Sequence, residues 1–529
     1  MANIATHQTL QTLWQQLSKE RGNHDFLIYD DPDSKHTETW TYAQFYREIK
    51  KLAAGLSHIG VKSTDNVAVQ VGNTPQFLES FFALAELGAT LVPLPPGYKC
   101  DECKYIIDKC TVDTIITTSD HLSYYIEPDS CHPQTRFKII LLDAPENQTR
   151  ENLWSYAELK QTALGKKETP TPIRAYRKDQ AVAEIMFTSG TTSLPKGVML
   201  THANLIFSGI FQNWQLAMRP EDRYATTMTV EHVNFQLSAL MPVLCSGATL
   251  ILFKRYSATT FWKSVLRHKA TLVQGMAMIA RTMLAQPSFP GEDEHNVRLM
   301  HYFLPITDSE KTQFTRRFNL RLLNSYGSTE TLVGVATDQA FGPTRWPAVG
   351  RVGIGYQIEI RDPQGQVLSP TEIGEIFVHG QPGLSLMLGY YQDREATAKV
   401  LSEDGWFATG DMGYFDEDGW LYFVDRQKNL IKRAGENISS TEVEDVLMNH
   451  PHVKEAAVIG VDDPIKDQAV AAFIVAHPGT DLTEADIQAH CTEKLAHFKV
   501  PTIVQFRTEL PKSQYGKIKK SSLTLNEEQ

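Results

Sequence analysis

The chain has 529 residues, of which 42% are hydrophobic and 21% charged, a composition typical of a globular protein with more than one domain. Its 51 Lys and Arg residues are outnumbered by 62 Asp and Glu residues, so the formal net charge is -11 and offers no general basic surface for nucleic acid. The longest apolar stretch, residues 239–253, is shorter than the ~20 residues of a membrane-spanning helix, and we interpret it as a buried strand with its lead-in.

The beginning of the chain, MANIATHQTLQTLWQQLSKERG, lacks the charged and apolar regions of a secretory signal. Six cysteines are too few for a disulfide framework in a chain of this length. Cys100 and Cys103 form a C-x-x-C without a second ligand pair, so we expect structural thiols there and no metal site. These features predict a cytoplasmic protein without a membrane span, and they leave its oligomeric state unknown.

Helices and strands are predicted to alternate near the N-terminus. An amphipathic helix with Phe45, Ile49 and Leu52 on one face is followed by a strand at 66–71, and a helix at 76–87 by a strand at 89–92. This alternation is typical of a parallel sheet covered by helices. We therefore expect an α/β fold with a large N-terminal domain of stacked α/β subdomains.

A loop rich in hydroxyl groups lies between a predicted strand at 181–187 and a predicted helix capped by Thr201. Its sequence, FTSGTTSLPKG, offers hydroxyls, backbone N–H groups and one ammonium to phosphate oxygens. It differs from the P-loop pattern, which occurs nowhere in the chain. The residues that we expect to bind nucleotide phosphate are Thr188, Ser189, Gly190, Thr191, Thr192 and Lys196.

Four further motifs follow the loop, namely NSYGSTE (324–330), GWFATGD (405–411), VDRQKNLIKRAGENIS (424–439) and LPKSQYGKIKK (510–520). In order and spacing they resemble the motifs of the acyl-adenylate-forming enzymes, which include acyl-CoA synthetases, firefly-type luciferases and the adenylation domains of peptide synthetases. The resemblance covers nearly the whole chain. It implies that the protein uses ATP and Mg²⁺ to convert a carboxylic acid into an acyl adenylate and then transfers the acyl group to CoA.

The resemblance also implies roles for single residues. Tyr326 would stack on adenine, Thr329 would touch the phosphate region, and Glu330 would hold Mg²⁺, which prefers carboxylate and phosphate oxygens. Asp411 and Arg426 would reach the ribose. These assignments place the nucleotide between motifs that lie far apart in the sequence.

The last part of the chain is predicted to form a separate small domain. Residues 413–433 are typical of two short strands around a turn at 416–419, followed by a polar joint. We place the boundary at this joint, with an adenylation domain at 1–424 and a mobile α+β domain at 425–529. A reaction with two incompatible arrangements of the site needs a way to exchange them.

The small domain is expected to contribute to both half-reactions. By resemblance, Asp425 is the hinge, and Lys517 is the catalytic lysine that bridges the substrate carboxylate and the α-phosphate. Such a lysine stabilises the charge that develops on phosphoryl oxygens. In the thioester half-reaction, Lys432 and Gly435 would replace Lys517 at the site.

The acid is expected to bind beside the segment TVEHVNFQ (229–236). By resemblance, His232 borders the acyl carboxylate, whereas Glu231 stands where relatives have an apolar residue. Glu231 has three open interpretations: it binds a quaternary ammonium group, it pairs with an ordinary amine, or it faces solvent. The remaining pocket wall is predicted to contain Phe235, Gln274, Met276 and Met278.

Ser193, the segment FLPITDSE (303–310) and the run RWPAVGRVG (345–353) resemble the crotonobetaine/carnitine-CoA ligase branch of the family. An acid:CoA ligase for a small carboxylic acid is therefore our first hypothesis. One alternative is a stand-alone adenylating enzyme that loads a carrier protein. A more remote alternative is a non-catalytic protein that binds a nucleotide or an acyl adenylate.

Overall fold

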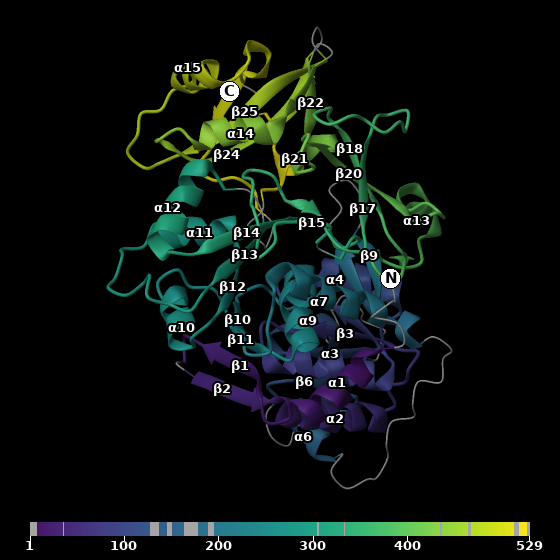
Figure 1. Ribbon diagram of the computed structural model, residues 1–529. Helices are drawn as coiled ribbons and strands as arrows, with labels where there is room; N and C mark the ends of the chain where they lie inside the picture. The colour runs from purple at the N-terminus through teal and green to yellow at the C-terminus, as the bar shows by residue number, and fades with distance from the viewer. Residues whose placement is uncertain are drawn as a thin grey trace.

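A computed structural model describes residues 8–34, 36–126, 137–144, 151–162, 178–188, 195–303, 306–332, 334–433, 436–463, 467–512 and 518–525. A large N-terminal domain carries a small C-terminal domain, and both mix helices with strands, as predicted (Figure 1). Several predicted site residues lie outside the described residues: Ser189, Gly190, Thr191, Thr192, Gly435 and Lys517, together with the side chain of Lys432.

One sheet of the large domain carries the predicted phosphate loop. Among the described residues its spatial order is β19 (Gly389–Tyr390), β9 (Lys196–Thr201), β8 (Val182–Thr188), β4 (Thr90–Pro93), β3 (Asn66–Gln70), β5 (Thr114–Thr117), β6 (Lys138–Leu141) and β7 (Leu153–Ser155). Pairing is parallel from β8 to β7 and antiparallel at β8–β9 and β9–β19.

A second sheet carries the segments that border the predicted acid pocket. Its order in the described chain is β16 (Arg351–Val352), β15 (Ala336–Thr337), β14 (Arg321–Tyr326), β13 (Leu299–Phe303), β12 (Leu272–Met276), β10 (Arg223–Thr226), β11 (Thr249–Phe253), β1 (Asp25–Asp31) and β2 (His36–Thr41). The strands from β14 to β1 pair in parallel, so the segments that follow β10, β12 and β14 leave the sheet at the same edge.

The principal helices of the large domain pack apolar faces against these sheets. They are α1 (Leu10–Glu20), α2 (Tyr42–His58), α3 (Pro75–Leu87), α4 (Cys100–Cys110), α6 (Tyr156–Thr162), α7 (His202–Leu216), α9 (Met241–Ser246), α10 (Phe261–Arg267), α11 (Ala277–Leu284) and α12 (Asp308–Phe318). The predicted face of α2 is buried, because Phe45, Ile49 and Leu52 have no exposed surface. Thr201 caps α7 as predicted, and its hydroxyl accepts a hydrogen bond from the Asn204 N–H at 3.0 Å.

A third sheet leads from the large domain toward the small one. It contains β17 (Gln357–Arg361), β18 (Gly374–His379), β20 (Trp406–Phe415) and β21 (Leu421–Arg426), with α13 (Arg394–Val400) between β19 and β20. The predicted turn at 416–419 joins β20 to β21. Strand β21 stays paired with β20 up to Arg426.

The small domain has its own sheet and core. The sheet contains β23 (Glu436–Ser439), β22 (Leu430–Arg433), β25 (Asp467–Ala476) and β24 (Val453–Asp463) in that order, and β26 (Ile503–Phe506) also pairs with β25. The helices α14 (Ser440–Met448) and α15 (Glu484–Lys494) complete the domain. In Figure 1, α14 and β24 lie on the side of the small domain that faces α12.

One prediction for a single segment needs correction, and another is confirmed. Cys100 is disulfide-bonded and not a free thiol, because residue spacing does not reveal a pairing made by folding; Cys103 is a buried free thiol. The apolar stretch at 239–253 contains the predicted buried strand, β11, and the segment that leads into it is helical, with a π-helix at Gln236–Leu240 continued by α9. No helix within the described residues is long and apolar enough to span a membrane.

Candidate active site

The two ends of the predicted phosphate loop are held side by side. Strands β8 and β9 are antiparallel, and Thr188 pairs with Lys196 across them. A loop that leaves and re-enters neighbouring strands in this way is confined at both ends. The pairing therefore places the Lys196 backbone directly beside the first hydroxyl residue of the motif.

Tyr390 connects Lys196 to Glu330. Its strand, β19, pairs with β9, and the Lys196 Nζ lies 4.9 Å from the centre of the Tyr390 ring. The Tyr390 hydroxyl donates a 3.0 Å hydrogen bond to Glu330 Oε1, and the Met387 N–H donates to the Glu330 carbonyl at 2.8 Å. Burial and the adjacent Glu330 carboxylate raise the pKa of Tyr390, so its hydroxyl remains a donor at neutral pH.

The donor set around Glu330 fits a magnesium ion that arrives with its nucleotide. Mg²⁺ keeps waters and phosphate oxygens as ligands and needs only one or two protein carboxylates. Glu330 is half-buried, and its carboxylate is oriented by Tyr390. Within the described part of the chain, no cluster of three His, Cys, Asp or Glu side chains forms a separate metal cage.

A second polar chain joins three residues of the predicted nucleoside site. The Tyr326 hydroxyl, at the end of β14, donates to Asp411 Oδ2 at 2.8 Å, and Arg426 Nε lies 3.4 Å from Asp411 Oδ1. Asp411 and Arg426 are partners across β20 and β21. Burial and the Asp411 carboxylate raise the pKa of Tyr326, which keeps the phenol protonated. Three motifs separated by up to a hundred residues therefore converge at one place.

The loop that carries His232 is held by buried side chains from other elements. Asn73 donates to the carbonyls of Met228 and Phe253, both at 3.0 Å, and accepts from the Val230 N–H at 3.0 Å. Gln274 donates to the Asn234 carbonyl at 2.7 Å. These contacts hold the loop from both sides.

His232 also has a defined orientation at the start of the short helix α8 (Val233–Phe235). Its Nδ1 accepts a 3.1 Å hydrogen bond from the Asn234 N–H. In the neutral imidazole the proton must then reside on Nε2. His232 can therefore present an N–H donor to a carboxylate.

Glu231 is buried, which contradicts the interpretation that it faces solvent. Only 7% of its surface is exposed, and no described residue hydrogen-bonds to its Oε2 atom. Burial raises the pKa of this carboxyl to about 7, although a hydrogen bond from Thr229 opposes the shift. The interpretations with a quaternary ammonium group or an amine both remain open.

The other predicted site residues have different exposures. Thr329 and Phe235 are buried, Gln274 is buried and also accepts from the Thr226 hydroxyl at 2.6 Å, and Met276 is half-buried at the end of β12. Met278, in the first turn of α11, is 45% exposed. The predicted pocket wall thus includes buried side chains, those of Phe235 and Gln274, and one exposed methionine, Met278.

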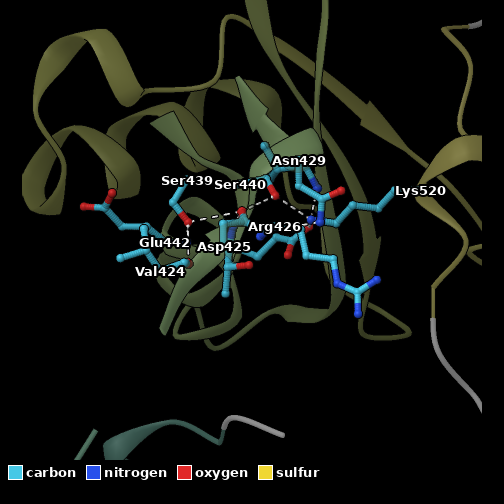
Figure 2. A network of polar contacts seen from close by, with 11 residues as sticks. Val424, Asp425, Arg426, Asn429, Ser439, Ser440, Glu442 and Lys520 are labelled. Carbon is cyan, nitrogen blue, oxygen red and sulfur yellow. Dashed lines mark hydrogen bonds and ion pairs between the residues drawn. The ribbon is translucent and has the colours of Figure 1, made fainter. Parts of the chain in front are cut away.

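The predicted hinge residue, Asp425, is fully surrounded by donors (Figure 2). Its Oδ1 accepts from the Arg426 N–H at 2.7 Å and from Asn429 Nδ2 at 3.2 Å. Its Oδ2 accepts from Ser440 Oγ at 2.8 Å and from the Thr441 N–H at 3.1 Å, at the N-terminal end of α14. A carboxylate at a helix N-terminus is electrostatically favourable.

Sequence reasoning missed two residues that orient the site, Tyr390 and Asn73. Tyr390 lies in LGYYQ, where a Gly-Tyr-Tyr run near the end of the large domain was the available signal. Asn73 precedes Thr74-Pro75 and resembles an ordinary turn residue, so its role becomes visible only from its three buried hydrogen bonds.

Comparison with known proteins shows which family the chain resembles over its length. The family model "AMP-binding enzyme" matches residues 13–391, and "AMP-binding enzyme C-terminal domain" matches residues 442–517. The chain is 38% identical to a crotonobetaine/carnitine–CoA ligase of Salmonella heidelberg over 98% of this chain and 100% of that protein. It is 39% identical to the enzyme of the same name from Proteus mirabilis, with the same shares of each chain covered.

A solved structure shares the fold. The o-succinylbenzoate coenzyme A synthetase of Bacillus subtilis, in complex with ATP and a magnesium ion, aligns with a TM-score of 0.81 and 26% identity. The alignment covers 97% of this chain and 98% of that one. With a family model that spans most of its length and relatives that match it almost from end to end, the chain belongs to the AMP-binding enzyme family.

Proposed function

We propose that this protein is an AMP-forming acid:CoA ligase. The observation that carries the proposal is the contact of Tyr390 with both Lys196 and Glu330, which brings a phosphate-loop ammonium and a metal-binding carboxylate to one place. The relatives named as CoA ligases support the same reaction. ATP and CoA are its cosubstrates, and Mg²⁺ is the metal ion that it uses.

The first half-reaction joins the acid to the nucleotide. A carboxylate oxygen of the acid attacks the α-phosphorus of ATP, the bond to the bridging oxygen of the β-phosphate breaks, and pyrophosphate leaves. Lys196 and Glu330 orient the phosphates, and the Nε2–H of His232 orients the acid carboxylate. Glu330 would hold Mg²⁺, which would neutralise part of the phosphate charge when bound. A carboxylate is already ionised at neutral pH, so the step needs no general base.

The second half-reaction transfers the acyl group. The CoA thiolate attacks the acyl carbon, AMP leaves, and the thiol proton passes to solvent. We propose that the small domain turns at Asp425, near the boundary between residues 1–424 and 425–529, and exchanges Lys517 for Lys432 and Gly435. A cytoplasmic location completes the proposal.

The substrate class is the finer part of the proposal. We infer a small acid with a quaternary ammonium group, because Glu231 is a buried carboxylate next to His232 and lacks a hydrogen bond from any described residue to Oε2. A buried carboxylate without a counter-ion is costly, and a cationic substrate would supply that counter-ion. The names of the relatives in Salmonella and Proteus support this class.

An acid panel tests the function directly. ATP–pyrophosphate exchange is measured with carnitine-like acids, short fatty acids, aryl acids and amino acids, and the best acid is then offered with CoA or with a phosphopantetheinyl carrier protein. We expect exchange with a betaine-type acid and thioester formation with CoA. Acyl-AMP formed without any CoA thioester would contradict the ligase, and transfer to the carrier protein alone would favour the alternative.

Replacement of Glu231 by glutamine tests the cation site while preserving side-chain shape. We expect kcat/KM for a quaternary ammonium acid to fall roughly 10- to 100-fold, the equivalent of about 1.5–3 kcal/mol for a charged contact. In the native enzyme kcat/KM should rise as the pH increases through about 7, because only the ionised Glu231 attracts a cation. Burial is the main cause that raises the pKa of Tyr98 to about 12, with Glu231 among the smaller ones, so Tyr98 stays neutral in this range.

The matched control is the uncharged acid in which a tert-butyl group replaces the trimethylammonium group. Its kcat/KM should be unchanged or improved by Glu231→Gln and should show no Glu231-dependent step with pH. Equal selectivity between the two acids in native enzyme and variant would refute the cation site.

Replacement of Tyr390 by phenylalanine tests the orientation of Glu330. The change removes one hydroxyl that donates to a carboxylate but keeps the ring beneath Lys196, so we expect roughly a tenfold increase in the Mg²⁺ concentration for half-maximal adenylation. Tyr391→Phe, one residue further on, is the control, because its hydroxyl contacts Asn66 and Gln392 instead. Identical Mg²⁺ titrations in the Tyr390 variant and the native enzyme would show that Tyr390 does not orient the metal ligand.

A further inference from the structure

The chain on either side of residues 513–517 is fixed to the small domain. Lys512 and Ile518 form an antiparallel bridge, and the Lys519 N–H donates to the Pro511 carbonyl at 2.8 Å. On the N-terminal side, Lys512 Nζ forms a 2.7 Å ion pair with Glu455 of β24. These contacts fix the described residues directly before and after 513–517.

On the C-terminal side, Lys520 forms a more buried contact with α14. Its Nζ donates to Ser440 Oγ at 2.6 Å and lies 2.8 Å from Glu444 Oε1. The Lys520 and Glu444 side chains are only 22% and 17% exposed. The same Glu444 oxygen accepts from the Val458 N–H at 2.6 Å, so Lys520 is tied through α14 to β24.

The contact continues to the predicted hinge. Ser440 Oγ accepts from Lys520 and donates to Asp425 Oδ2 at 2.8 Å, which makes a continuous path from Lys520 to Asp425 (Figure 2). Ser440 is almost completely buried. The path joins two positions that are 95 residues apart in the sequence but meet at the first turn of α14.

The location of Lys520 is not one that helix stability alone would favour. A cation beside the N-terminal turn of a helix is opposed by the helix dipole. Here the carboxylates of Asp425 and Glu444 compensate for that cost. A passive surface ion pair, by comparison, is usually exposed and contributes little.

We propose that Lys520 is a positioning residue for adenylation: it holds the chain that directly follows Lys517, from residue 518 onward, against α14 at the hinge. Lys520 acts through the backbone three residues away and does not touch the substrate. Because a misplacement of about 1 Å can cost roughly 100-fold in rate, an anchor three residues from the proposed catalytic lysine in the sequence affects the chemical step. The inference rests on the proposed function and on the role of Lys517 in it.

Lys520→Met, which removes the charge but keeps an unbranched chain, tests the anchor. We expect kcat for acyl-AMP formation to fall roughly 10- to 100-fold, with the KM values for ATP and acid within about twofold of native. Thioester formation from supplied acyl-AMP should stay within about threefold, because Lys517 is not used in that step. Lys520→Arg should restore most of the adenylation rate, since a guanidinium can reach the same two oxygens.

Lys519→Met is the matched control, because Lys519 is exposed and contacts Pro511 through its backbone N–H. Its two half-reactions should equal those of the native enzyme. A parallel loss of both half-reactions in Lys520→Met, or no loss in either, would overturn the inference.

Hydrogen exchange separates this inference from the proposed function. The amides of residues 518–525 should exchange faster in Lys520→Met than in the native protein and the Lys519→Met control. Equal exchange in all three proteins would refute the anchor whatever the activity. A native protein that forms no acyl-AMP with any acid would instead refute the ligase, and the exchange result would still report on the anchor.

Discussion

Replacement of Lys517 by alanine should lower the rate of acyl-AMP formation by roughly 100- to 1,000-fold. The proposed role of this lysine is to stabilise charge that develops on the α-phosphate and the attacking carboxylate, and loss of one such preorganised donor has an effect of about this size. Acyl transfer from supplied acyl-AMP to CoA should remain within about threefold of native. ATP affinity should be mostly kept, because Lys196, Glu330 and Asp411, the residues that we propose to bind the nucleotide, are unchanged.

The measurement is a single-turnover assay of each half-reaction, together with calorimetric titration of ATP. Lys519→Ala, two residues further on, controls for a general effect of removing positive charge from this segment. An adenylation rate equal to the native rate would remove Lys517 from the mechanism. It would also favour the hypothesis of a non-catalytic binding protein if the native rate were itself negligible.

Replacement of Glu330 by glutamine should have the second-largest effect, a decrease of roughly 100-fold in kcat/KM for adenylation. The amide can still accept the Tyr390 hydrogen bond, so the side chain should keep its place while losing the charge that attracts Mg²⁺. A metal ion contributes several kcal/mol of charge stabilisation in reactions of this type. The fold should be little affected, because Glu330 is only half-buried.

Calorimetry gives a readout that does not depend on turnover. Mg·ATP should bind more weakly to Glu330→Gln, whereas ATP measured in the presence of a chelator should bind native protein and variant alike. Glu395→Gln on α13 is the control, because this side chain is 83% exposed and forms an ion pair with Lys399. Equal affinity of native protein and Glu330→Gln for Mg·ATP would contradict the assignment of Glu330 as the metal ligand.

Local sequence patterns predicted much of the architecture. The helix at Tyr42–His58, the strand at Asn66–Gln70 and the capped helix at His202–Leu216 were all predicted from periodicity and from Thr201. Such signals are reliable because the spacing of apolar residues and the capping of a helix depend on residues that are close together in the sequence. The apolar stretch at 239–253 also contains the predicted buried strand, but its periodicity did not show that the lead-in is helical, because a short apolar run is compatible with either a strand or a buried helix.

The family and its chemistry were also predicted from the sequence, and the family is confirmed by the match over residues 13–391 and 442–517. The motifs contain the residue types that are needed to bind phosphate, ribose and a metal ion. The roles of single residues and the boundary at Asp425 stay predictions, which the variants above address.

The sequence by itself determined which motifs are present, in which order, and therefore which reaction class the chain belongs to. Only the tertiary structure decided that Tyr390 joins Lys196 to Glu330, that Glu231 is buried, and that Lys520 reaches Asp425 through Ser440. The reason is physical: periodicity and capping report contacts within a few residues, whereas these contacts arise when strands and helices distant in the chain pack together. Hydrogen-bond geometry and burial at such contacts exist only in the folded state.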